Sequence, residues 1–246
     1  MALGPLPLLG TFHELSIATH DVRAAVEFYE RLGFTQAPTT DAFAHPYGVL
    51  TDGRLAIGLH GRASPSPTLT FVRPGIAAAL PGFAAVGITL STRRVGEDVF
   101  NEVAFADPFG QAVAVLEART YSPAPRAAVE PSLCGDFAEI SLPVSDFAVA
   151  QAFWEPLGFV AAEETHTPYR QLSLTSDHID LAFHAPQLCR RPMLVFRDAG
   201  LPARLARLRA LGLTVTDLAM DASGAVTAAL LEDGAGTTLL LAEAQL

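Results

Sequence analysis

The sequence predicts an α+β protein built from two tandem domains, each a pair of βαβββ modules. The first observation behind this prediction is an internal repeat. Residues 12–34 (FHELSIATHDVRAAVEFYERLGF) and residues 137–159 (FAEISLPVSDFAVAQAFWEPLGF) share ten identities in 23 positions without a gap. The second is the order of strand-like and helix-like patterns inside each repeat, and the third is a weaker recurrence of that order after each repeat. A repeat at a fixed spacing indicates that one structural unit is used again, so we expect two similar domains offset by about 125 residues.

Each repeated segment predicts a strand followed by a helix. The stretches HELSIAT and AEISLPV alternate between polar and apolar residues, which is typical of a half-buried strand. Asp21 and Asp146 stand where a helix N-cap belongs, and apolar residues follow both at helical spacing. Gly33 and Gly158 predict the helix ends, because glycine readily takes the left-handed conformation found there. Three further strands are expected in each copy, near residues 34–37, 47–51 and 55–60 and near residues 159–162, 169–174 and 179–184.

The same order recurs more weakly after each repeat. The turn sequences DPFG at 107–110 and EDGAG at 232–236 each precede a final strand. The expected elements are strands at 68–72, 102–105 and 111–116 with a helix at 74–86, and strands at 193–196 and around 232–236 with a helix at 201–211. The helix at 74–86 is expected despite Pro81.

These elements group into four modules. The modules cover about residues 11–61, 66–118, 135–185 and 191–243. We therefore expect one domain at residues 1–118 and a second at residues 135–246. Residues 119–134 carry three prolines and predict a linker between them.

Composition excludes several functions. The net charge of −10 and the pI near 5.1 argue against a nucleic acid or an anionic membrane as partner. All 16 basic residues are arginine, and without lysine neither Schiff-base catalysis nor a Walker-type phosphate loop is possible. No apolar run reaches the roughly 18 residues of a membrane-spanning helix. Cys134 and Cys189 match no zinc or disulfide pattern, so a reducing cytoplasm is the expected location.

The motifs resemble a known superfamily. Four βαβββ units, the D-x(7)-Y/W-x(2)-LGF pattern of both repeats and the DPFG turn resemble the vicinal oxygen chelate superfamily. That superfamily includes glyoxalase I, extradiol dioxygenases, fosfomycin-resistance proteins and bleomycin-binding proteins. The resemblance covers about residues 11–118 and 135–243. It implies that two modules join edge to edge, so that their curved, mainly antiparallel sheets form a cup with helices on the convex side.

Alternation along the strands sorts residues between the core and the cups. Leu15 and Ile17 should face the helix, which sends Glu14 and Ser16 into the cup. The residues expected to bind a ligand are Ser16, Tyr47, Arg54 and His60 in the first cup and Ser141, Tyr169, Gln171, His178, Asp180 and His184 in the second. Tyr47 and Tyr169 each follow a proline, and they form either an aromatic wall for a flat ligand or a cover on the core.

The resemblance also implies where a metal would bind. Metal-dependent members take His or Glu ligands from the first strand of each module and from late strands. The corresponding positions are Glu14, Gly58, a residue near 67–68 and Ala114 in the first domain, and Glu139, Ala182, a residue near 192–193 and Leu240 in the second. Only one oxygen ligand remains in each cup, whereas a catalytic divalent site usually needs three protein ligands. We therefore expect no cofactor; if a divalent metal binds at all, Glu139 with His178 or His184 is the expected site.

The repeated Glu14 and Glu139 are the candidate catalytic residues, with two interpretations. Each is either a buried carboxylate satisfied by neighbouring donors, or a carboxylate of raised pKa that acts as a base or anchors a ligand. The sequence accordingly favours a protein that binds a small organic molecule in its cups without the usual metal. The alternative is a glyoxalase-like lyase, isomerase or dioxygenase-type enzyme with Glu14 or Glu139 as base or an atypical metal site. A structural module with filled cups is the third possibility. The tandem domains are compatible with a monomer or a homodimer.

Overall fold

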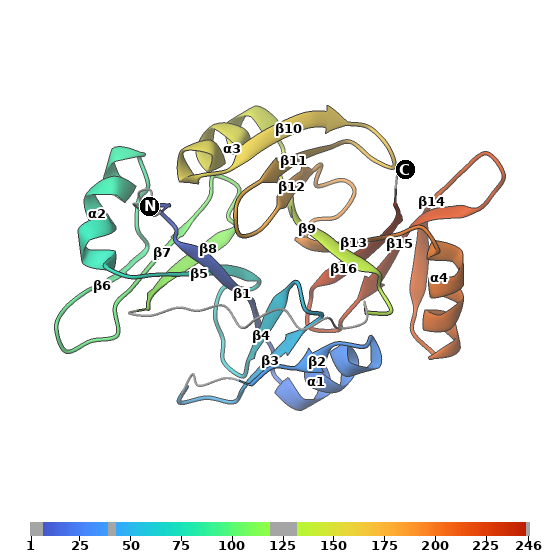
Figure 1. The fold of residues 1–246 in the computed structure, drawn as a ribbon, viewed down its shortest axis with the longest axis horizontal. Helices are drawn as coiled ribbons and strands as arrows, with labels where there is room; N and C mark the ends of the chain where they lie inside the picture. Colours follow the sequence, from blue (N-terminus) through green and yellow to red (C-terminus); the bar gives the residue numbers. More distant parts are fainter. Residues whose placement is uncertain (1–6, 39–42, 119–131, 245–246) are drawn as a thin grey trace, which may run out of the picture.

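The structure is a computed structural model that describes residues 7–38, 43–118 and 132–244. The described chain forms two eight-stranded sheets with two α-helices in each half (Figure 1). The first half contains β1 (Thr11–Ala18), α1 (Val22–Arg31), β2 (Thr35–Gln36), β3 (Tyr47–Thr51), β4 (Ala56–His60), β5 (Thr68–Arg73), α2 (Ile76–Ala85), β6 (Thr92–Arg94), β7 (Glu102–Ala106) and β8 (Ala112–Glu117). The second contains β9 (Asp136–Pro143), α3 (Phe147–Trp154), a 3-10 turn (Glu155–Leu157), β10 (Val160–Thr165), β11 (Gln171–Thr175), β12 (Leu181–His184), β13 (Met193–Asp198), α4 (Leu201–Ala210), β14 (Val215–Met220), β15 (Val226–Glu232) and β16 (Thr238–Glu243).

The two sheets have the same topology, which confirms the predicted fold class. Their strand orders are β2-β3-β4-β1-β5-β8-β7-β6 and β10-β11-β12-β9-β13-β16-β15-β14. In the first sheet the pairs β1–β4 and β5–β8 are parallel, while the other pairs are antiparallel. The antiparallel pair β1–β5 joins the two modules. Each domain is therefore two βαβββ units placed edge to edge.

Local signals explain where α1 and α3 begin. The side chain of Asp21 accepts a hydrogen bond from the Ala24 amide, and Asp146 does the same for the amides of Ala148 and Val149. Both residues are therefore N-caps, as predicted. The helix of the second repeat is shorter than expected: α3 ends at Trp154, and a 3-10 turn with Pro156 follows. Proline lacks an amide proton and ends the regular helical ladder there.

The sequence did not predict the second strand, the one directly after the helix, in either of the later modules. β6 and β14 lie at sheet edges and carry no fully buried side chain, so no alternating pattern marks them. Of the predicted linker, residues 119–131 lie outside the described part of the chain. Its last residues form a turn, closed by a bridge between Ser132 and Gly135, and the Leu133 amide donates to the Leu32 carbonyl.

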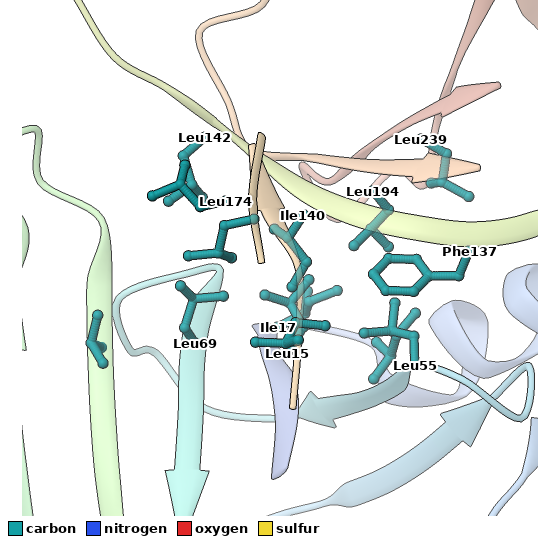
Figure 2. Close-up of a cluster of buried hydrophobic side chains, with 14 of the residues drawn as sticks. Leu15, Ile17, Leu55, Leu69, Phe137, Ile140, Leu142, Leu174, Leu194 and Leu239 are labelled. Atoms are coloured by element: carbon teal, nitrogen blue, oxygen red, sulfur yellow. The ribbon is translucent and has the colours of Figure 1, made fainter. Parts of the chain in front are cut away.

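The two domains share one hydrophobic core. Leu15, Ile17 and Leu55 of the first domain lie close to Phe137 and Ile140 of the second (Figure 2). All of these side chains lie on the sheet faces that also pack against the helices. The opposite sheet faces carry Glu14 and Glu139, so the two cups lie away from this shared core. None of the described helices combines the length and the apolar character needed to cross a bilayer.

Candidate functional site

The first cup is the face of the first sheet that carries Glu14. This residue is 3% exposed and lies at the centre of a hydrogen-bonded network. Its Oε1 accepts hydrogen bonds from Ser16 Oγ (2.7 Å) and from His60 Nε2 (2.8 Å), and its Oε2 accepts one from the Tyr47 hydroxyl (2.6 Å). Thr70 Oγ1 lies 2.7 Å from Ser16 Oγ and extends the network across β5. Glu14, Ser16, Tyr47 and His60, all proposed from the sequence, are thus brought together.

The network keeps Glu14 ionised. Burial raises the pKa of this carboxyl, but the hydrogen bonds from His60, Tyr47 and Ser16 outweigh burial and hold the pKa below its ordinary value. The interpretation of Glu14 as a base with a raised pKa, one of the two drawn from the sequence, is therefore wrong. A carboxylate with three donors is well suited to orient its neighbours and poorly suited to take up a proton.

Gly58 on β4 makes this position of Glu14 possible. A β-carbon at Gly58 would overlap both carboxylate oxygens of Glu14. The corresponding residue in the second domain is Ala182, which pairs with Ser141 as Gly58 pairs with Ser16. The carboxylate of Glu14 therefore fills space that a side chain occupies in the other cup.

Two aromatic residues that the sequence did not single out complete the first cup. His45 Nε2 lies 3.0 Å from His60 Nδ1, so two imidazoles connect Glu14 to the half-buried His45. Phe43 is 38% exposed and packs its ring 4.6 Å from Tyr47 and 5.2 Å from His60, measured between ring centroids. Neither lies in the repeat or in a regular strand, so no pattern marked them. Burial, and then the charge of Arg62, lower the pKa of His45, which is therefore neutral at pH 7.

The second cup, the sheet face that carries Glu139, is built differently. Glu139 accepts hydrogen bonds from Ser173 Oγ (2.8 Å) and Arg197 Nη2 (3.2 Å). Burial raises its pKa, and these two partners do not offset that effect, while the charge of Asp180 adds to it. Here the predicted direction of the shift holds. Glu14 and Glu139 thus occupy the same position in the repeat, but their pKa values are shifted in opposite directions.

His184 in the second cup does not contact Glu139. It is fully buried, its Nδ1 lies 2.7 Å from Ser141 Oγ, and its Nε2 lies 3.0 Å from the carbonyl oxygen of Cys189. Because a carbonyl can only accept, Nε2 carries the proton and Nδ1 accepts from the Ser141 hydroxyl. Burial lowers the pKa of His184 to about 4, so the ring is neutral at pH 7.

The polar residues of β11 are offset from those of β3. Tyr47 pairs with His60 across the sheet, whereas Gln171 pairs with His184. Gln171 rather than Tyr169 is therefore the counterpart of Tyr47, and the two tyrosines do not form equivalent walls. The Tyr169 hydroxyl and the Gln171 side-chain oxygen are buried without a hydrogen-bond partner in the described structure.

The floors of the two cups differ in side-chain size. Strand pairing places Thr68, Thr70, Ala104, Ala112 and Ala114 in the first cup where Met193, Val195, Leu230, Thr238 and Leu240 lie in the second. The alanines and Thr68 are half-exposed, whereas Met193, Val195 and Leu240 are 0% exposed. Met193, Val195 and Leu240 pack with Leu188, Cys189 and Leu218 into a separate apolar cluster. The floor of the first cup is thus partly exposed, whereas the floor of the second is covered by its own side chains.

Two predicted site residues lie outside the cups. Arg54 is exposed and lies 3.5 Å from Asp136 of the second domain, because Asp52 holds the amides of Arg54 and Leu55 in a turn before β4 begins. His178 is exposed in a similar turn, in which Ser176 Oγ accepts its amide hydrogen bond. In both cases a turn interrupts the strand, so the alternation used to assign the faces does not apply.

The donors in the cups do not fit a metal centre. Among the described residues no three His, Cys, Asp or Glu side chains converge on one point. The fallback set of Glu139, His178 and His184 does not assemble, because His178 lies in the exposed turn and His184 is engaged by Ser141 and Cys189. At the positions across from Glu139, Val195 and Leu240 offer no donor atom.

A surface hollow of about 560 Å³ lies elsewhere, at the start of α3. It is lined by residues including Asp146, Phe147, Glu164 and Arg170. Arg170 is already occupied, because it pairs with Glu164 at 2.6 Å and lies over the Phe147 ring. The hollow is open to solvent and contains none of the residues of the two networks. We therefore assign the candidate site to the first cup.

Comparisons with known proteins support the fold. No family model matches the chain, and no curated protein matches it. Among solved structures, a catechol 2,3-dioxygenase matches with a TM-score of 0.64 at 16% identity, over 96% of this chain and 88% of that chain. The 2,3-dioxygenase LapB from Pseudomonas sp. KL28 matches with 0.64 at 15% identity, over 99% and 94%.

A Mn(II)-bound glyoxalase from Novosphingobium aromaticivorans matches with a TM-score of 0.62 at 14% identity, over 97% of this chain and 83% of that chain. Identities this low carry the fold and not the reaction. The chain therefore shares its fold with these dioxygenases and with this glyoxalase.

Proposed function

We propose that the protein binds a small aromatic molecule with hydroxyl groups in its first cup, without a metal ion. The observation that carries this proposal is the difference between the two floors. Thr68, Ala104, Ala112 and Ala114 form a floor of small, partly exposed side chains beside a buried polar network. A concave surface with a few convergent polar groups is the usual form of a small-molecule site.

The side chains around the first cup favour a flat ligand. Phe43, His45, Tyr47 and His60 form a continuous set of rings with neighbouring centroids 4.6–5.3 Å apart. Such a set offers both ring faces and ring edges to an aromatic partner. The hydroxyls of Ser16 and Tyr47 and the imidazole of His45 supply hydrogen-bonding groups beside it. Catechol is a suitable probe, because a catechol dioxygenase is among the proteins of the same fold.

The alternative is a metal-dependent lyase, isomerase or dioxygenase. It is supported by the Mn(II)-bound glyoxalase that has the same fold. The donor set speaks against it, since a catalytic metal site usually takes three protein ligands and the cup offers Glu14 with its oxygens already bonded to three donors. Metal dependence of binding separates the two functions.

Calorimetric titration with catechol in the presence of EDTA tests the proposal. We expect saturable binding to one site per chain. Ala114→Phe, which places a ring on the cup floor, should weaken binding at least tenfold, whereas Ala78→Phe on the exposed side of α2 should leave it unchanged. Absence of binding would reject the proposal. Binding that requires added Mn(II) or Fe(II) would favour the metal-dependent alternative.

A further inference from the structure

We propose that Glu14, His60 and His45 form a proton relay, which removes a proton from a phenolic hydroxyl of the bound ligand at Nδ1 of His45. This inference rests on the proposed function, because it needs a phenolic ligand in the first cup. It differs from the sequence-based hypothesis in one respect. The group that accepts the proton is His45, and Glu14 and His60 are positioning residues that act through it.

The geometry defines the relay. His60 Nε2 lies 2.8 Å from Glu14 Oε1, and His60 Nδ1 lies 3.0 Å from His45 Nε2. Both distances are those of ordinary hydrogen bonds. His45 Nδ1 has no hydrogen-bond partner within the described structure. The chain of bonds thus runs from a carboxylate that is 3% exposed to an imidazole at the half-exposed edge of the cup.

The chemistry of each atom fixes the direction of the bonds. An ionised carboxylate can only accept, so the Nε2 of His60 carries a proton and donates it to Glu14. With His60 neutral, its Nδ1 is an acceptor, and the Nε2 of His45 must be the donor. A neutral histidine carries one N–H. The Nδ1 of His45 is therefore left with a free lone pair, as a base requires.

Proton transfer then balances within the chain. The O–H bond of the ligand breaks, its electron pair stays on the phenolate oxygen, and a new N–H bond forms at Nδ1 of His45. The proton on Nε2 of His45 can pass to Nδ1 of His60. His45 is then neutral again, and the positive charge rests on His60, hydrogen-bonded to the Glu14 carboxylate. No oxidant, reductant or metal takes part.

The surrounding charges favour this transfer. A proton held on His45 is opposed by burial and by the charge of Arg62, both of which lower the pKa of His45. After the transfer, His60 Nε2 still donates to Glu14 Oε1, which lies 2.8 Å away. Arg62 in turn attracts the anionic form of the ligand. Tyr47 is the remaining titratable group in contact with Glu14.

Spectrophotometric titration with 4-nitrocatechol tests the relay, because the anion of a nitrophenol absorbs at longer wavelength than its neutral form. At a pH below the pKa of the free dye, binding should produce the absorption of the anion. The apparent pKa of the bound dye should fall by at least one unit, which is a tenfold change in proton affinity. His45→Gln should bind the dye with most of this shift lost. His60→Gln should behave in the same way, because it interrupts the relay.

Two control variants separate the relay from simpler causes. His184→Gln in the second cup should keep the full shift. Arg62→Gln removes charge attraction alone and should keep more than half of it. A dye that binds without ionising, or that ionises equally in His45→Gln, would overturn the relay and leave the proposed function intact. If Arg62→Gln lost as much of the pKa shift of the dye as His45→Gln, the relay would also be overturned. No heat of binding in a parallel calorimetric titration would overturn both proposals.

Discussion

The hydroxyl of Tyr29 donates a 2.9 Å hydrogen bond to Oδ2 of Asp233, which lies 204 residues further along the chain. Tyr29 belongs to α1 of the first domain, and Asp233 belongs to the turn before the last strand of the second. The second domain makes the equivalent contact with the first: Trp154 Nε1 of α3 donates to Oδ2 of Asp107, in the turn before β8, at 3.4 Å. In each turn the other carboxylate oxygen accepts two backbone amides. The D-x(7)-Y/W pattern and the acidic turns are therefore the two halves of one domain contact.

Tyr29→Phe tests this contact. Asp233 is 7% exposed, so removal of its hydroxyl partner leaves a buried carboxylate oxygen without a donor. We expect a loss of about 1–3 kcal/mol in the free energy of unfolding, measured by denaturant titration. Tyr169→Phe is the matched control, because the Tyr169 hydroxyl is buried without a partner in the described chain and its removal should cost less. Equal losses in both variants would contradict this account.

Gly58→Ala tests the close approach between β4 and Glu14. A methyl group at this position overlaps the carboxylate and forces it away from His60 and Tyr47, which should destabilise the fold by about 1–3 kcal/mol. Gly48→Ala on the adjoining strand is the control, since its β-carbon would lie 3.5 Å from the nearest atom of Val26. A second substitution, Glu14→Ala, should reduce the cost of Gly58→Ala, because neighbouring sites couple. If the losses of stability caused by Gly58→Ala and Glu14→Ala were additive in the double variant, Gly58 and Glu14 would not compete for space.

The pH dependence of stability should reveal His184. Its folded pKa of about 4 lies below the ordinary 6.5, so the unfolded chain takes up a proton first as the pH falls. The stabilisation is complete above pH 6.5 and is lost between pH 6.5 and 4, by about 3 kcal/mol. His184→Gln should be less stable at pH 7 but lose less stability over that interval. If the free energy of unfolding, measured by denaturant titration, fell equally with pH in His184→Gln and in the wild type, the prediction would be contradicted.

Glu14→Gln and Glu139→Gln should have different effects at pH 7. The lowered pKa of Glu14 means that its ionised form stabilises the fold above pH 4.5, and that this stabilisation is lost as the pH falls below 4.5. The raised pKa of Glu139 means the opposite: stability is lost as the pH rises above 4.5 through the folded pKa. Glu14→Gln should therefore cost about 1–3 kcal/mol at pH 7, while Glu139→Gln should be neutral or stabilising. Thermal unfolding at pH 7 and pH 4 checks both signs, and equal costs at pH 7 would refute them.

The sequence predicted the order of the elements. It also predicted which side chains of the regular strands face the core and which face the cups, because both properties depend on neighbours within a few residues. Asp21 and Asp146 cap their helices, and Glu14 and Ser16 face the first cup, for reasons that alternation and capping already contain. The failures at Arg54 and His178 occur where a side chain closes a turn and interrupts that alternation.

Tertiary structure alone decided which cup has a partly exposed floor and what Glu14 does there. The pKa of Glu14 depends on donors from three strands, and the opposite shift of Glu139 arises from different partners at the same place in the repeat. His45 gained its role only because folding places it 3.0 Å from His60. The resemblance had placed Ala114 and Leu240 in the two cups, but strand pairing and burial were needed to show that Leu240 covers its floor and Ala114 does not. Contacts between distant segments carry these properties, and local patterns do not encode them.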